Sequence, residues 1–167
     1  MNLLEMSDVV DDRNNIINSY GDIFDNMISP VGFTFNLKRS KRIRLDDNSR
    51  RTITLEDKHL NNIWNIFTDN LLHAIYPRSQ RKCITRPALA IGGFEYGKSK
   101  NNPHLHIVVD NVNKIYRHSF EWIIAQCISN TKKNTSWIGK EIHFNNSTDR
   151  KFVSYFLKSS RFVSLYR

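Results

Sequence analysis

Cysteine is scarce in this sequence, and long apolar runs and internal repeats are missing. Its two cysteines, Cys83 and Cys127, lack the spacing of a zinc site and lie in apolar surroundings, so we expect two reduced core residues. No apolar run approaches the roughly 20 residues that span a bilayer. Acidic residues at positions 8, 11 and 12 fall where a secretory signal would still be apolar. These absences predict a cytoplasmic protein without a membrane partner.

The charge of the chain is divided unevenly along its length. The 167 residues suit one main domain, and the formal net charge is +9. Residues 1–30 carry a net charge of −5, whereas residues 31–167 carry +14. We therefore predict an acidic helical extension (1–30) on a basic domain (31–167). Such a basic body favours a polyanionic partner, nucleic acid first, over a basic surface that serves only solubility.

Apolar spacing predicts an α+β fold, because helical and alternating patterns both occur. We expect one or two short N-terminal helices, interrupted at Gly21. Further elements are expected at residues 31–37 (strand), 55–76 (helix), 84–96 and 102–110 (strands), 115–129 (helix), 136–144 (strand) and 150–160 (helix). The order β-α-β-β-α-β-α predicts a single antiparallel sheet with helices on one face and the other face open for a ligand. This topology is close to that of RNA-recognition domains.

Two histidines share one face of the second strand in the predicted hairpin. Side chains alternate along a strand, so Leu105, Ile107 and Val109 lie on one side. His104 and His106 lie on the other side, close enough together to hold one metal ion. The alternative is a strand that merely exposes two histidines.

The last predicted helix carries a tyrosine at the edge of its apolar face. At about 100° per residue, the apolar arc consists of Phe152, Val153, Phe156 and Leu157. Tyr155 lies at the edge of this arc, with Lys151 and Lys158 one turn to either side. The alternative is a boundary tyrosine whose hydroxyl only reaches water.

Three motifs therefore stand in order: Phe33-Thr34-Phe35-Asn36, His104-Leu105-His106 and Tyr155-Phe156-Leu157-Lys158. The sequence resembles the HUH endonucleases, specifically rolling-circle replication initiator (Rep) proteins with a single catalytic tyrosine. Those proteins carry an FTLN-like strand, an HUH strand (His, hydrophobic, His) and a YxxK helix in this order. The motifs span most of the chain, and the predicted order of elements agrees with that family's fold.

The resemblance implies a divalent-metal-dependent endonuclease that nicks and rejoins single-stranded DNA to initiate rolling-circle replication. Tyr155 is then the nucleophile, which leaves a 5′-phosphotyrosyl intermediate and a free 3′-OH. Lys158 either favours the phenolate or steadies the phosphate. The implied partners are single-stranded DNA at a replication origin, including a hairpin form, and a host or separate helicase, since the sequence has no Walker-type glycine loop.

The metal ion implied is Mn²⁺ or Mg²⁺. A cation polarises the scissile phosphate and neutralises the charge that builds up there. Two imidazoles, His104 and His106, and one carboxylate leave positions open for phosphate and water. Glu95, in the partner strand of the hairpin, is the best placed acid, and many Rep proteins supply a ligand from just upstream of the HUH strand. Glu141 and His143 are weaker candidates that rest on strand phase alone.

Basic residues cluster just after the first predicted strand. Seven of them lie within residues 38–51, around a turn-like centre. A basic loop or hairpin beside a polar sheet face suits phosphate contacts, whereas the alternative is a solvated charged loop. The predicted DNA-binding residues are Asn36, Lys38, Arg39, Lys41, Arg42, Arg44, Arg51 and Lys151.

Two other functions stay open at this point. A single-tyrosine HUH transposase-like nickase shares the motif order, although such enzymes typically have a glutamine where this chain has Ser159. Relaxases generally place the tyrosine ahead of the histidines. A non-catalytic nucleic-acid-binding module fits the basic charge, but it would display aromatic residues on two adjacent strands. Here the corresponding faces carry Thr34, Asn36, His104 and His106.

Overall fold

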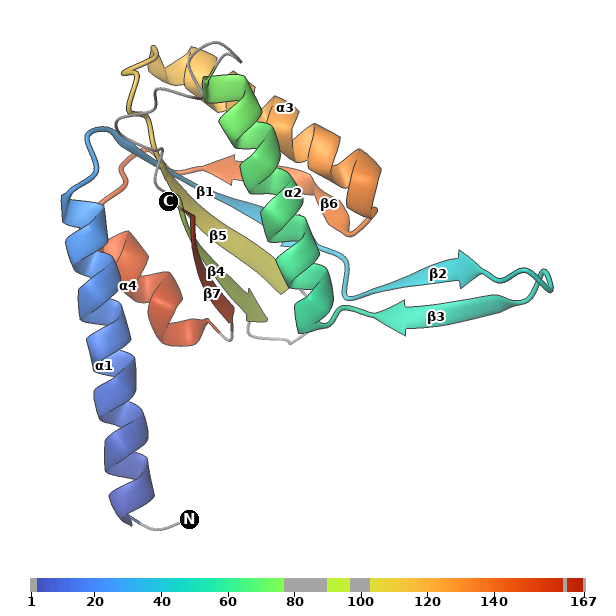
Figure 1. Ribbon diagram of the computed structural model, residues 1–167, viewed down its shortest axis with the longest axis horizontal. Helices are drawn as coiled ribbons and strands as arrows, with labels where there is room; N and C mark the ends of the chain where they lie inside the picture. Colours follow the sequence, from blue (N-terminus) through green and yellow to red (C-terminus); the bar gives the residue numbers. More distant parts are fainter. Residues whose placement is uncertain (1–2, 77–89, 97–102, 161, 167) are drawn as a thin grey trace.

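Five antiparallel strands form the central sheet (Figure 1). The computed structural model describes residues 3–76, 90–96, 103–160 and 162–166. The strand order is β6-β1-β5-β4-β7, and every neighbouring pair is antiparallel. The strands are β1 (Pro30–Leu37), β4 (Ala90–Tyr96), β5 (Pro103–Asp110), β6 (Ile138–Phe144) and β7 (Phe162–Tyr166). The α+β class predicted from the sequence is confirmed.

Helices α2 (Asp57–Ile75) and α3 (Arg117–Thr135) cover one face of this sheet (Figure 1). The residues of β1 and β5 that point to this face are apolar, and with the two helices they form the main core. Phe33, Phe35 and Phe67 are completely buried there, with ring centroids 5.8 to 6.5 Å apart. Truncating such a phenylalanine to alanine typically costs about 3–5 kcal/mol, so this core fixes how the strands are held.

Helix α4 (Arg150–Ser159) packs on the opposite face, so helices cover both faces of the sheet. Two adjacent glycines of β4 show this. A Cβ on Gly92 would lie 2.3 Å from the Trp64 ring in α2, whereas a Cβ on Gly93 would lie 2.4 Å from the Phe156 ring in α4. The expectation that all helices lie on one face is therefore wrong.

The correction has a physical cause in a second, smaller core. Its buried residues come from α4, from β4 and β5, and from the N-terminal helix: Phe24, Met27, Ile91, Val108, Val153, Phe156 and Leu157. Burial of the apolar arc of α4 stabilises the fold by about 25 cal/mol for each Å² of apolar surface removed from water. Ile91 and Val108 make one end of the second sheet face apolar, and α4 is buried against that end.

The N-terminal helix α1 (Leu3–Asp25) is continuous, and the predicted interruption at Gly21 does not occur. Gly21 instead allows a close approach, since a Cβ there would lie 2.8 Å from the guanidinium of Arg150 in α4. That guanidinium forms ion pairs with Asp22 and Asp25. The acidic extension therefore lies against α4, as Figure 1 also shows, and its acids neutralise one of the domain's bases.

Strands β2 (Ser40–Arg44) and β3 (Arg50–Thr54) pair only with each other in a two-stranded sheet. This β2–β3 ribbon projects away from the helices and the central sheet (Figure 1). Of the two forms expected for the basic segment, loop or hairpin, the structure has the hairpin. The ribbon carries the cluster of bases away from the rest of the domain.

The predicted element ranges and the cysteine predictions are confirmed in part. Helices α2, α3 and α4 lie close to the predicted ranges, whereas β7 was not predicted. Cys127 is buried, and burial raises the pKa of its thiol to about 11, as expected of an inert core residue. Cys83 and the first part of the predicted strand 84–96 fall outside the described residues. None of the described helices is long and apolar enough to cross a membrane.

Candidate active site

Strand register brings the first two sequence motifs together on the face covered by α4. His104 of β5 stands opposite Asn36 of β1 and opposite Glu95 of β4. One step along, His106 stands opposite Thr34 of β1. Residues directly opposite in antiparallel strands point to the same face, so these side chains form one polar surface. The register was not visible in the sequence, but Glu95 could be selected as the best placed acid in the partner strand of the hairpin.

Of the three predicted metal ligands, the two histidines both face one carboxylate oxygen of the third, Glu95. Nε2 of His104 lies 3.6 Å from Oε1 of Glu95, and Nε2 of His106 lies 3.2 Å from the same atom. Glu95 and His106 are buried, and His104 is half-buried. A charged carboxylate in such a place needs a partner, because its desolvation is costly. A protonated imidazole or a bound cation would be such a partner.

Thr34 fixes the orientation of the His106 ring. Its hydroxyl oxygen lies 2.8 Å from Nδ1 of His106, within hydrogen-bonding distance. If Nδ1 carries the proton, Nε2 presents its lone pair toward Glu95. Burial is the main cause that lowers the pKa of His106, and the Glu95 carboxylate opposes only part of that effect. The ring is thus favoured in the neutral form that a metal ion requires.

The chemistry of these residues suits a divalent cation, and their spacing is close to what such an ion requires. Neighbouring ligands on an octahedral ion with bonds of about 2.0–2.1 Å lie about 3 Å apart. The two nitrogen–oxygen distances at Glu95 are slightly longer than this. Accordingly, the described residues include no group of three or more His, Cys, Asp or Glu that is already arranged as a metal site. Within the same described part, the buried Nε2 of His106 makes no hydrogen bond of good geometry although Glu95 lies 3.2 Å away, and a cation between the two groups would satisfy both.

The third motif reaches this cluster through α4. Asp149 caps the helix by accepting a 2.9 Å hydrogen bond from the Phe152 amide. The Phe156 ring stacks on His106 at 5.8 Å between centroids, with only 10° between the ring planes. Tyr155 meets the same imidazole edge-on, with ring centroids 6.4 Å apart, and its side chain is 62% exposed. The predicted nucleophile therefore lies beside a predicted ligand and is open to solvent.

Both lysines of α4 are exposed. Lys151 follows the start of the helix, and Lys158 belongs to its last turn. Lys158 is therefore placed one turn from Tyr155, on a helix that is held against the cluster. Its part in activating the tyrosine and the DNA contact of Lys151 stay predictions.

Strand β6 extends the polar surface away from Glu95. Asn36 donates a 2.8 Å hydrogen bond from Nδ2 to Glu141, and Nε2 of His143 lies 3.8 Å from the same carboxylate. His143 stands opposite Thr34 in the sheet. Glu141 and His143 are mostly exposed, and β1 separates their strand from β5. The two weaker candidates thus neighbour the cluster, and the link from Asn36 to Glu141 was not anticipated.

The predicted DNA-binding bases divide into two groups. Lys41 is half-buried: its ammonium lies 4.6 Å from the Trp137 ring centroid and donates to the carbonyl of Thr135. The other bases of this segment are exposed: Lys38, Arg39, Arg42, Arg44 and Arg51. Lys41 therefore has a visible structural role, whereas the exposed bases are accessible to a polyanion.

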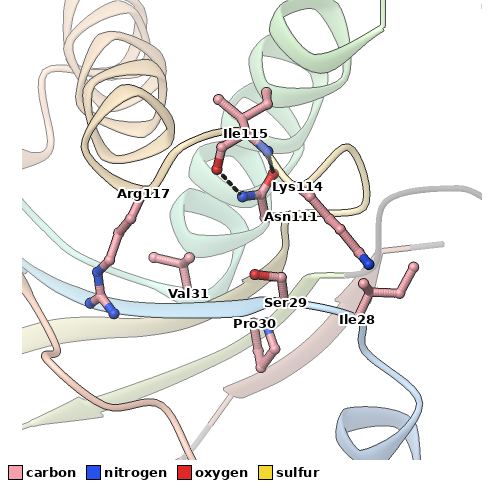
Figure 2. A pocket seen from close by; sticks show the side chains of 8 residues that line it. All are labelled: Ile28, Ser29, Pro30, Val31, Asn111, Lys114, Ile115 and Arg117. Atoms are coloured by element: carbon pink, nitrogen blue, oxygen red, sulfur yellow. Dashed lines mark hydrogen bonds between the residues drawn. The ribbon is translucent and has the colours of Figure 1, made fainter.

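A separate cavity of about 290 Å³ lies at the far end of β5 (Figure 2). Pro30, Asn111 and Arg117 are among its lining residues. The Asn111 amide group bonds to both the backbone amide and the carbonyl of Ile115, so it closes a turn. Asn111 lies five positions after His106, which corresponds to roughly 16 Å along a strand. This cavity is not part of the histidine cluster.

Comparisons of the chain with protein-family models, with curated proteins and with solved structures gave no match. What the cluster does must therefore be inferred from its own residues and from the motifs they form. Three features are available for this: a buried carboxylate facing two histidines, an exposed tyrosine on the helix packed beside them, and a basic ribbon.

Proposed function

We propose that this protein is a divalent-metal-dependent endonuclease that nicks and rejoins single-stranded DNA through Tyr155, and that it initiates rolling-circle replication as a Rep protein of the HUH type. The observation that carries the proposal is the position of Tyr155 beside His106, which itself faces Glu95. Three motifs far apart in the sequence supply these side chains. A structural ion pair alone would need neither an exposed tyrosine nor a second histidine.

Each side chain has a distinct task in this proposal. Glu95, His104 and His106 would hold Mn²⁺ or Mg²⁺, and the ion would polarise the scissile phosphate and offset its developing charge. The Tyr155 oxygen attacks phosphorus, so a phosphorus–tyrosine bond forms while the bond to the 3′ oxygen breaks. The phenolic proton is released, and the leaving 3′ oxygen gains one. Lys158, one turn from Tyr155, supports the attack by favouring the phenolate or by steadying the phosphate.

The covalent link explains why the same site would also rejoin strands. The phosphotyrosyl bond replaces the phosphodiester bond without hydrolysis, so a free 3′-OH can attack it in the reverse direction. The series β1-α2-β4-β5-α3-β6-α4 agrees with the element order of Rep endonuclease domains, with α1, the β2–β3 ribbon and β7 as additions. The motif order favours a replication initiator over a relaxase.

A non-catalytic nucleic-acid-binding module is the less favoured function. Such a module stacks bases on aromatic side chains of its central strands. In β1 and β5 the corresponding positions hold hydroxyl, amide and imidazole groups, and α4 packs beside them. These groups suit ligation and proton chemistry better than stacking.

A labelled-DNA assay tests the proposal. The protein is incubated with a randomised pool of single-stranded oligonucleotides labelled at the 3′ end, with Mn²⁺ or with EDTA. The 5′-phosphotyrosyl product retains the 3′ part of the strand, so we expect label on the protein that survives denaturation and depends on Mn²⁺. Tyr155→Phe should lose this label. Tyr116→Phe is the matched control and should keep it, since Tyr116 is 72% exposed and lies outside the cluster. Label that appears equally with EDTA would contradict the metal-dependent mechanism.

A further inference from the structure

The β2–β3 ribbon is held in a defined direction at its base. The backbone amide of Leu55 donates to the carbonyl of Arg39, which closes the ribbon where it leaves the domain. Beside this point, Trp137 lies between Lys41 and His59, whose ring centroid is 4.6 Å from the indole. These contacts join the ribbon to β6 and α2. The ribbon is therefore an oriented arm and not a free loop.

The two faces of the ribbon differ in chemistry. Cross-strand pairs share a face, and Arg44 pairs with Arg50 while Arg42 pairs with Thr52. One face thus presents three exposed arginines and a threonine. The other face carries Ile43 with the exposed Arg51 opposite it, and the half-buried Lys41 and Ile53 near the base. No acidic residue occurs in either strand; the two acids of the hairpin lie in its turn.

This arrangement is unfavourable for the ribbon alone. Like charges directly opposite each other in a sheet are destabilising, and an isolated two-stranded hairpin is marginal in water. Arg44 and Arg50 are nevertheless directly opposed residues near the tip. An anionic partner that lies along this face would remove the repulsion, so the arginine face is explained by binding and not by folding.

The shape and composition of the ribbon point to duplex DNA. Proteins that bind single strands combine positive charge with aromatic side chains for base stacking, and residues 38–54 contain no aromatic residue. A two-stranded ribbon fits the major groove of B-DNA, which is about 12 Å wide. Arginine there can bond to guanine O6 and N7, and threonine can bond to base edges. We propose that the arginine face of the ribbon docks in the major groove of duplex DNA.

The position of the ribbon relates this duplex to the active site. β1 carries Asn36 opposite His104 and ends at Leu37, and the ribbon begins at Ser40. A duplex held by the ribbon would therefore be tethered to the end of β1 that carries Asn36, and a single strand leaving it could reach the histidine cluster. Only this last step rests on the proposed nicking function; duplex binding by the ribbon does not.

Binding measurements in EDTA separate duplex binding by the ribbon from metal-dependent nicking. Fluorescence anisotropy is measured with a short DNA duplex, with a single strand of the same sequence and with an RNA duplex, whose major groove is too deep and narrow for side chains to read. We expect Arg44→Gln/Arg50→Gln to weaken DNA-duplex binding by at least ~10-fold and to affect the other two ligands much less. Lys133→Gln/Lys140→Gln removes two exposed charges elsewhere, and should change duplex affinity by no more than about threefold.

Two further measurements guard against misfolding and against phosphate binding alone. The thermal midpoint of the arginine variant should equal or exceed that of the wild type, because a repulsive pair is removed. Duplexes with 7-deazaguanine should bind more weakly to the wild type but not to the variant. Equal losses for single-stranded DNA or for duplex RNA would overturn major-groove docking, as would insensitivity to 7-deazaguanine. Tyr155→Phe should bind the duplex normally, so a failure of nicking leaves this test intact.

Discussion

The hydroxyl oxygen of Thr34 lies 2.8 Å from Nδ1 of His106, and Nε2 of the same ring lies 3.2 Å from Glu95. One imidazole thus joins β1 to β4 across β5. This relationship gives Thr34 a positioning role, since its hydroxyl holds the ring plane of a proposed metal ligand.

Replacing Thr34 by valine should weaken metal binding. The substitution keeps the side-chain shape but removes the hydrogen bond to His106, and losses of such outer contacts typically lower metal affinity ~10- to 100-fold. Mn²⁺ binding measured by calorimetry is the direct readout. Thr34→Ser keeps the hydroxyl and should restore most of the affinity. Equal affinities for the valine variant and the wild type would show that the contact does not orient a ligand.

Glu95 and Glu141 can be separated as candidate ligands. Glu95→Gln removes the charge that faces both histidines and should reduce Mn²⁺ affinity more than any change at Thr34. Glu141→Gln is the matched control, because its carboxylate lies on the same polar surface but bonds to Asn36. A larger loss for the Glu141 variant would move the proposed metal site toward β6.

Gly93 should be essential for placing the tyrosine. A Cβ at this position would lie 2.4 Å from the Phe156 ring and 2.5 Å from Oγ of Ser160. Gly93→Ala must therefore displace α4, which overpacking data suggest costs about 1–3 kcal/mol. We expect adduct formation to fall by more than tenfold. Gly21→Ala is the control, because it meets only the flexible end of Arg150; similar activities for both variants would contradict the role given to Gly93.

The acidic helix α1 should stabilise the fold. Phe24 is 8% exposed and packs with α4 residues, so Phe24→Ala should lower the free energy of unfolding by about 3–5 kcal/mol. Ile16 is 46% exposed, and Ile16→Ala should change it by less than about 0.5 kcal/mol. Urea titration measures both values. A small effect of Phe24→Ala, combined with tighter DNA binding, would instead identify α1 as a mask over the DNA surface.

The sequence predicted the parts of the fold that depend on local pattern. The periodicity of α2 and α4 and the alternation in β1 and β5 place their residues on the correct faces. Glu95 followed from its place in the partner strand of the hairpin. The bond between Thr34 and His106 could not be predicted, because it depends on the register between two strands far apart in the chain.

The placement of helices on both faces was also missed, for a related reason. The second face is mixed, with Ile91 and Val108 at one end and the histidines at the other. Alternation identifies a face as polar on average, but it does not show that one end is apolar enough to bury α4. The role of Gly93 depends on the same packing, because it allows the close approach of Phe156 in α4.

Identification of the residue that becomes joined to DNA tests the central claim most directly. The wild-type protein is incubated with single-stranded DNA and Mn²⁺, then digested with nuclease and trypsin, and the peptides are analysed by mass spectrometry. Cleavage after Lys151 and Lys158 releases residues 152–158, in which Tyr155 is the single tyrosine. We predict a nucleotide adduct on this peptide, absent from Tyr155→Phe. An adduct at Tyr96 or Tyr166, or on the Tyr155→Phe protein, would contradict the proposed mechanism.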